Sequence, residues 1–155
     1  MQHRMNYPAA SPAAYKAMLG METYLHSCGL EPALLHILKL RASQINGCAY
    51  CIDMHWKDSR AAGEPEHRLY ALDAWRESPF YTEREQAALA WCEALTRVSE
   101  THAPDEDFAA VRAHFDDKAL ADLTWAIAAI NAWNRMAIAF RAVPGKYQPP
   151  ARRDA

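Results

Sequence analysis

The stretch Gly47-Cys48-Ala49-Tyr50-Cys51-Ile52-Asp53-Met54-His55 combines a Cys-x-x-Cys pair with a histidine four residues after the second cysteine. On a helix of 3.6 residues per turn, Cys48, Cys51 and His55 are spaced so that their side chains project from one face. Gly47 lets the backbone turn just before the pair, which places Cys48 in the first turn of a new helix. This pattern predicts two thiols and a base on a helical scaffold. It is typical of a redox dithiol or of part of a metal site, and we favour the redox dithiol.

Helix signals continue on both sides of this stretch. Ser11-Pro12 and Glu31-Pro32 place proline at a first helical position, and Thr82-Glu83-Arg84-Glu85 is a capping box. Asp116-Asp117 caps a last helix that Pro144-Gly145 ends. The predicted helices cover residues 12–27, 32–46, 48–62, 65–75, 82–98, 105–115 and 117–143.

Strand signals are absent from the sequence, since valine occurs only three times and no β-branched residues alternate with polar ones. We therefore predict an all-α fold, a bundle of about six to seven helices. This excludes the βαβ setting in which a Cys-x-x-Cys pair indicates a thioredoxin fold.

Composition narrows the class of protein. The 155 residues are 51% hydrophobic and 23% charged, which is typical of a folded globular chain, and we predict a single domain over residues 1–155. The net charge of -2 gives no reason to expect nucleic acid or a membrane surface as a partner. Residues 1–8 lack the apolar core of a secretion signal, and polar residues interrupt the longest apolar run, 120–140. We predict a cytoplasmic protein, in which four cysteines are not a disulfide framework.

The spacing of the pair suits thiol chemistry. A thiol reacts as its thiolate, which the positive end of a helix favours at Cys48, and His55 can accept a proton from Cys51 or stabilise its thiolate. Residues at i and i+3 also have Cα atoms near the roughly 5.5 Å that a disulfide prefers. The metal alternative would need a fourth ligand, since the usual second Cys/His pair is missing. The remaining candidates for that ligand are His36, Asp53 and Cys92.

Several other polar or reactive residues are predicted to be structural. Cys28 and Cys92 are isolated and are expected to be buried and inert. Asp53 and Lys57, four residues apart, are expected to form an ion pair on the solvent face of their helix. Polar side chains inside the apolar helix 117–143 need partners if they are buried, so we expect a structural network or an oligomer contact there. These side chains are Asn131, Asn134 and Arg135.

A long run of residues around the pair is informative as a whole: Leu38-Lys39-Leu40-Arg41-Ala42-Ser43-Gln44-Ile45-Asn46-Gly47-Cys48-Ala49-Tyr50-Cys51-Ile52-Asp53-Met54-His55, continued through Glu64. In this run, and in the further segments 74–78, 81–85 and 130–135, the chain resembles the alkylhydroperoxidase D (AhpD)-like branch of the carboxymuconolactone decarboxylase family. The resemblance covers most of the chain.

The resemblance implies an all-helical AhpD-like fold that assembles as a homotrimer or homohexamer, and a thiol-dependent peroxidase activity. It implies that Cys51 attacks the hydroperoxide, that Cys48 resolves the product as a disulfide, and that His55 belongs to a proton relay. An external dithiol, dihydrolipoyl or thioredoxin-like, would then reduce the disulfide. No flavin, haem or metal would be needed.

The sequence departs from the family at one position of the relay. The family usually has a glutamate twelve residues before the first cysteine, and this chain has His36 there. A histidine can also move protons near neutral pH, so His36 is a candidate replacement. We therefore predict a cytoplasmic peroxidase that reduces organic hydroperoxides through a Cys48–Cys51 cycle. The alternative is a non-enzymatic oligomeric redox sensor, or a general disulfide oxidoreductase, that uses the same pair.

Overall fold

The computed structural model describes residues 2–150, and in that range the chain is helical with no strand, which confirms the all-α prediction. Within the described residues, six helices have eight or more residues, and the other four helical segments are shorter. The elements are α1 (Tyr7–Ala10), α2 (Pro12–Leu25), α3 (Pro32–Asn46), α4 (Ala49–Ala61), α5 (Glu66–Tyr70), the 3₁₀ helix η1 (Leu72–Glu77), α6 (Glu83–Thr96), α7 (Val98–Thr101), α8 (Asp105–Arg112) and α9 (Asp117–Phe140).

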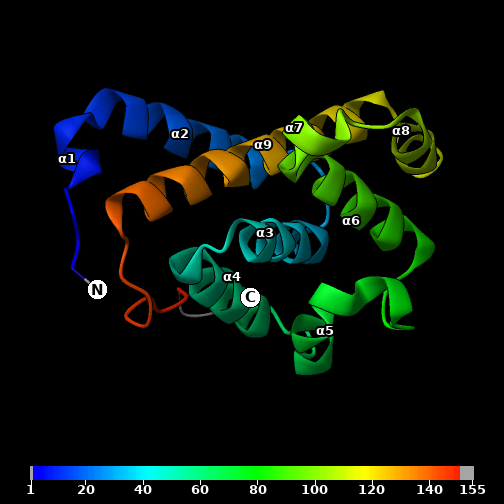
Figure 1. The fold of residues 1–155 in the computed structure, drawn as a ribbon, viewed down its shortest axis with the longest axis horizontal. Helices are drawn as coiled ribbons and strands as arrows, with labels where there is room; N and C mark the ends of the chain where they lie inside the picture. Colours follow the sequence, from blue (N-terminus) through cyan, green and yellow to red (C-terminus); the bar gives the residue numbers. More distant parts are fainter. Residues whose placement is uncertain (1, 151–155) are drawn as a thin grey trace.

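Helix α3 lies at the centre of the fold. Figure 1 shows α2 and α9 along one side of it, α4 along the other, and α6 toward one end. The helix is buried on nearly every face from Leu34 to Ser43. Burial on all sides is expected for a helix that other helices surround.

Polar side chains bind α9 to the end of α3, beside the Cys-x-x-Cys stretch. The Asn46 amide donates to Asn131 Oδ1 at 2.9 Å and to Asn134 Oδ1 at 2.8 Å. The Asn134 amide donates to Ser43 Oγ at 3.1 Å. Because both Asn131 and Asn134 are buried, these hydrogen bonds satisfy groups that would otherwise be costly inside the protein. The predicted structural network is therefore present, and it fixes the backbone just before Cys48.

Local capping signals predicted several helix boundaries well. The Thr82–Glu85 capping box forms with both of its hydrogen bonds. The Asp116 carboxylate accepts from the backbone N–H of Ala119 and starts α9. Helix α9 ends at Phe140, three residues before the predicted end, because Arg141 adopts a left-handed backbone with φ 55°.

The predicted helix over 65–75 is wrong as a single element. The chain forms α5 and then η1, and Ala74 has a non-helical backbone inside η1. The break lets Trp75 enter the core, where its indole N–H donates to Glu93 Oε1 at 2.9 Å. Tertiary packing thus overrides the local helix signal.

No helix within residues 2–150 is both long enough and apolar enough to cross a lipid bilayer.

Candidate active site

The Cys-x-x-Cys pair lies at the junction of α3 and α4. Gly47 ends α3 with a left-handed backbone, φ 68°, which glycine adopts at no steric cost. Cys48 is then the N-cap of α4, not a residue of its first turn as the sequence suggested. Its sulfur accepts from the backbone N–H of Cys51 at 3.3 Å. The sulfur therefore takes the place of the side-chain oxygen that usually caps a helix.

Cys48 and Cys51 are joined by a disulfide, with their Cα atoms 5.3 Å apart. This separation lies within the ordinary range for a disulfide, so the pair closes at the start of α4 without rearrangement of the helix. Each cysteine is only 2% exposed. A molecule that reacts with either sulfur must therefore enter the protein, or the protein must open.

His55 lies one helical turn after Cys51 and is buried. Burial lowers the pKa of its imidazole to about 3, and the nearby charge of Lys39 acts in the same direction. His55 is therefore neutral at physiological pH, and its unprotonated ring nitrogen can accept a hydrogen bond. Its Nε2 atom is buried and has no hydrogen-bond partner within the described chain. Buried polar atoms without a partner are rare in folded proteins, and a catalytic role is one reason for them.

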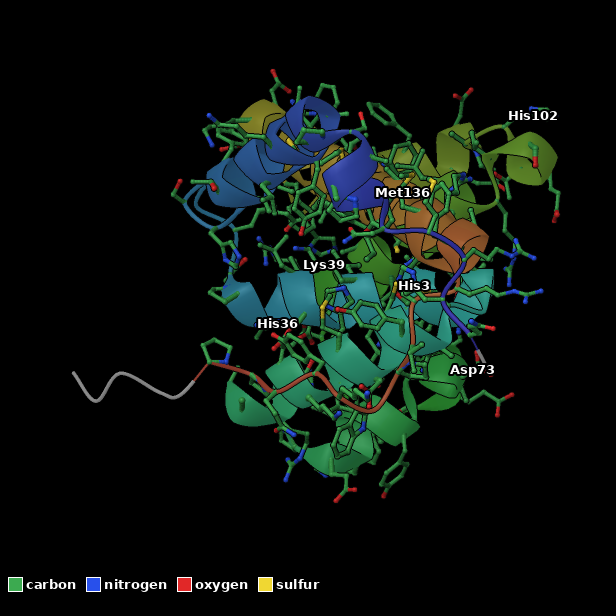
Figure 2. The ribbon with its side chains drawn as sticks, turned by 90° about the vertical axis from the view of Figure 1, so that its left-hand side faces the viewer. His3, His36, Lys39, Asp73, His102 and Met136 are labelled. Carbon is green, nitrogen blue, oxygen red and sulfur yellow. A yellow bond between two sulfur atoms is a disulfide. The ribbon has the colours of Figure 1, made fainter. Side chains whose placement is uncertain are left out.

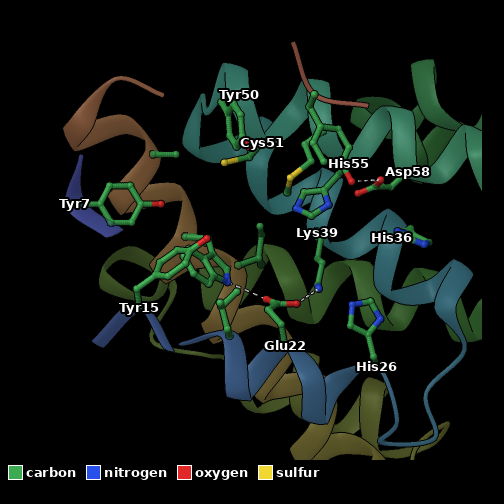
Figure 3. A pocket seen from close by; sticks show the side chains of 16 residues that line it. Tyr7, Tyr15, Glu22, His26, His36, Lys39, Tyr50, Cys51, His55 and Asp58 are labelled. Carbon is green, nitrogen blue, oxygen red and sulfur yellow. Dashed lines mark hydrogen bonds and ion pairs between the residues drawn. The ribbon is translucent and has the colours of Figure 1, made fainter. Parts of the chain in front are cut away.

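A cavity of about 310 Å³ reaches the pair from one side, and Cys51 lines it while Cys48 does not. Figure 3 shows aromatic side chains around this cavity and a small group of charged ones at its wall. It is lined by Tyr7, Tyr15, Leu19, Glu22, His26, His36, Lys39, Tyr50, Cys51, Met54, His55, Asp58, Ile130, Trp133, Ala137 and Tyr147.

His36 lies on this cavity, so the fold brings together Cys51, His55 and His36 as one group, with Cys48 directly behind Cys51. Partial burial lowers the pKa of His36, and Asp58 counteracts this only in part. His36 is therefore a neutral imidazole near pH 7. The glutamate that the family resemblance implies at this position would instead be negatively charged.

The sequence reasoning missed a second group of residues on the cavity wall. Glu22 Oε2 accepts from Lys39 Nζ at 2.6 Å, and Glu22 Oε1 accepts from the Trp133 indole N–H at 2.9 Å. These residues come from α2, α3 and α9, so no local pattern could join them. One signal was visible: a lysine between Leu38 and Leu40, in the most apolar part of α3. Figure 2 shows His36 and Lys39, both from α3, among the side chains of the described chain.

The C-terminal segment closes part of the cavity. The Asp53 carboxylate binds Lys57 Nζ and the backbone N–H of Gly145, each at 2.9 Å. The Tyr147 hydroxyl donates to Asp58 Oδ1 at 2.7 Å and its ring lines the cavity. The predicted Asp53–Lys57 ion pair therefore exists, but it is partly buried and holds this segment against α4.

The other two cysteines are buried, as predicted. Burial raises the pKa of Cys92 to about 12, which makes its thiol unreactive. Cys92 lies against the backbone of α3, where its thiol donates to Leu38 O. No group of three or more His, Cys, Asp or Glu side chains within residues 2–150 is arranged to hold a metal ion.

Fold and site together define a class: a helical protein with a buried Cys-x-x-Cys disulfide, in which one sulfur and a histidine meet at a cavity. The chain belongs to the carboxymuconolactone decarboxylase family, whose model matches residues 12–94, and to its AhpD-like branch. The matched residues run from α2 into α6 and include the whole Cys-x-x-Cys stretch.

Relatives and solved structures agree with this assignment. The uncharacterised protein YdfG of Bacillus subtilis is 42% identical over 139 residues, which cover 90% of this chain and 95% of YdfG. The crystal structure of ATU0492 from Agrobacterium tumefaciens, a protein of unknown function suggested to be the antioxidant defence protein AhpD, is 49% identical. Its TM-score is 0.91, with 94% of this chain and 100% of that chain covered.

A peroxidase-related protein of Ralstonia eutropha, described as an alkylhydroperoxidase AhpD core, shares the fold. Its TM-score is 0.78 at 22% identity, with 90% of this chain and 75% of that chain covered. At this identity the similarity shows a shared fold.

Proposed function

We propose that this protein is a thiol-dependent peroxidase in which Cys51 attacks a hydroperoxide and Cys48 resolves the product. The observation that carries the proposal is the asymmetry of the pair. Cys51 lines the cavity together with His55, whereas Cys48 lies behind it at disulfide distance. A substrate in the cavity meets one sulfur, and the second sulfur is already in place to close the disulfide.

The cycle balances without a cofactor. The Cys51 thiol loses its proton to solvent through a relay of the neutral imidazoles His55 and His36, and the thiolate attacks the terminal oxygen of the hydroperoxide. The O–O bond breaks, the leaving alkoxide takes a proton and departs as an alcohol, and Cys51 becomes a sulfenic acid. The Cys48 thiol then attacks the Cys51 sulfur, the disulfide forms, and water leaves. Two thiols and one hydroperoxide become one disulfide, one alcohol and one water.

Turnover requires an external dithiol that reduces the Cys48–Cys51 disulfide by thiol–disulfide exchange. Because the pair is buried, we expect a slender dithiol, such as a dihydrolipoyl group, to reach it more easily than a protein surface does. A thioredoxin-like partner would need the covering residues to move. We expect His36 to move protons in the relay as a neutral base.

A single-turnover experiment tests the proposal. Fully reduced protein is mixed without oxygen with one equivalent of cumene hydroperoxide, and peroxide loss and intact mass are followed. The expected result is rapid loss of peroxide and of two hydrogens, with Cys48 linked to Cys51 in the peptide map. Cys51→Ser should abolish the reaction, and Cys48→Ser should stop at a sulfenic acid on Cys51.

Full activity in both variants would refute this mechanism. A slow or absent reaction, with both thiols still free, would instead favour the redox sensor or the general disulfide oxidoreductase. The observation behind that alternative is His36, which stands where the family resemblance implies a glutamate.

A further inference from the structure

An ion pair between the buried Lys39 and the half-buried Glu22 lies on the wall of the cavity. Lys39 is 8% exposed, and its ammonium binds Glu22 Oε2 at 2.6 Å. The second oxygen of Glu22 is held by the Trp133 indole, so both charged groups are fixed in place. Removing a lysine and a carboxylate from water costs free energy that their attraction often does not recover. An ion pair of this kind beside reactive groups is a candidate for a functional role.

We propose that Lys39, positioned by Glu22, supplies the positive charge that favours the thiolate of Cys51. Lys39 and Glu22 line the same cavity as Cys51 and His55, and Figure 3 shows the Lys39–Glu22 contact on the cavity wall facing His55. The inference rests on the proposed function only in taking Cys51 as the attacking thiol. It adds two residues that the Cys-x-x-Cys pattern does not contain. Lys39 stabilises the thiolate, and Glu22 positions Lys39.

A cation matters here because the imidazoles of the site do not provide one. His55 and His36 both have lowered pKa values and are neutral near pH 7. A nearby cation lowers the pKa of a thiol by favouring its charged form. Lys39 is therefore the group on the cavity wall that can stabilise an anion at Cys51, and also the alkoxide that leaves when the O–O bond breaks.

Among the other titratable groups on the wall, the carboxylate acts against this effect and three half-buried phenols do not change it. Asp58 is the other carboxylate, and it accepts from the Tyr147 hydroxyl. Burial raises the pKa values of Tyr7, Tyr50 and Tyr147, so these phenols stay uncharged. His26 and Tyr15, both contributed by α2 or its C-cap, complete the titratable lining.

The test measures the pKa of the Cys51 thiol without any peroxide. In a Cys48→Ser background, which prevents the disulfide, the rate of alkylation of Cys51 by iodoacetamide is followed against pH by peptide mapping. Lys39→Met should raise the apparent pKa of Cys51 by about half a pH unit or more. Glu22→Gln should lower it, because Lys39 then acts without its counter-charge. Lys39→Arg should restore the value found with Lys39.

Opposite shifts separate an electrostatic role from a structural one, since loss of packing would not move the pKa in two directions. Lys118→Met is the matched control, because it breaks the 2.6 Å pair of Lys118 with Asp122, and neither residue lines this cavity. It should leave the pKa of Cys51 unchanged.

Shifts of the same sign in Lys39→Met and Glu22→Gln, or no shift in either, would overturn the inference. If Lys39→Met does not fold, Glu22→Gln decides alone, because a pKa that does not fall contradicts the proposal. The outcome is independent of peroxidase activity. A protein that shows the opposite shifts but consumes no hydroperoxide would keep this inference and lose the proposed function.

Discussion

At the scale of single residues, the surroundings of the two sulfurs differ although the residues are three positions apart. Cys48 caps α4 and contacts backbone, whereas Cys51 reaches the cavity. Cys92, which forms no disulfide, differs from both, because it is completely buried and burial raises its pKa. The reactivity of the four thiols should follow these surroundings rather than the sequence pattern.

We therefore predict an order of modification. In the fully reduced protein, a small alkylating reagent should modify Cys51 first, then Cys48, and Cys92 last, because the cavity reaches Cys51 and not Cys48, and burial raises the pKa of Cys92. Mass spectrometry of peptides after brief exposure to iodoacetamide measures it. Modification of Cys48 before Cys51 would contradict the assignment of Cys51 as the thiol that meets substrate.

The burial of His55 leads to a second prediction for a single residue, which concerns how the free energy of unfolding depends on pH. Its pKa is about 3 in the folded protein and near 6.5 when unfolded, so the unfolded chain binds the proton first as the pH falls. The stabilisation from this group is complete above about pH 6.5 and is lost toward pH 3. Between about pH 7 and pH 5, the free energy of unfolding should fall by about 2 kcal/mol because of this group.

Urea denaturation of the oxidised protein at the two pH values measures this loss. His55→Gln, which does not titrate, is the comparison that removes the contribution of the carboxylates. An equal pH dependence in both proteins would show that His55 is not buried as a neutral imidazole.

At the scale of elements, the position of the Cys-x-x-Cys pair depends on how α9 packs on α3. Asn46 lies directly before Gly47 and is the only one of the three asparagines of the network that is on α3. Its two hydrogen bonds connect the end of α3 to buried groups of α9. The cavity wall at Ile130 and Trp133 belongs to the same part of α9.

We predict that Asn46→Ala lowers the free energy of unfolding by about 1–3 kcal/mol, because it leaves the carbonyl oxygens of Asn131 and Asn134 with fewer partners. It should also speed exchange of the backbone amides near Cys48. Denaturation and hydrogen exchange measure the two effects. Thr82→Ala, which removes a helix cap far from the pair, should cost about 1 kcal/mol and leave that exchange unchanged.

At the scale of the whole molecule, exposed aromatic residues lie along the outer side of α2 and α9. Trp125 is 54% exposed and Tyr24 is 45% exposed, and both line a shallow groove between these helices. Large exposed aromatic side chains are typical of contacts between protein chains. The homotrimer or homohexamer that the family resemblance implies stays a prediction, and this groove is where we expect part of the contact.

Trp125→Glu should therefore shift the protein toward a smaller species in light scattering or analytical ultracentrifugation, because a charge cannot be buried cheaply in an interface. Phe108→Glu, an exposed aromatic outside this groove, is the comparison. An assembly that is unchanged by Trp125→Glu, or a wild-type protein that is already monomeric, would contradict the prediction.

Features that depend on neighbouring residues could be predicted from the sequence. The Thr82–Glu85 capping box and Asp116 fix helix starts through hydrogen bonds within three residues, and Gly47 ends α3 by its own backbone freedom. The same locality explains why Cys48 and Cys51 could be paired from their spacing. Where the sequence reasoning failed, at residues 65–75, distant packing of Trp75 against Glu93 had overridden the local helix signal.

The sequence by itself determined the helical class, the Cys-x-x-Cys pair and the histidine one turn after it, because each follows from periodicity, caps or spacing along one stretch of chain. Only the tertiary structure decided which sulfur meets the cavity and which residues surround it. Glu22, Lys39 and Trp133 come from three helices and meet through helix packing, which depends on contacts between residues far apart in the sequence. The charges that Lys39 and Glu22 place beside the cavity therefore depend on the packed fold, although both residues are visible in the sequence.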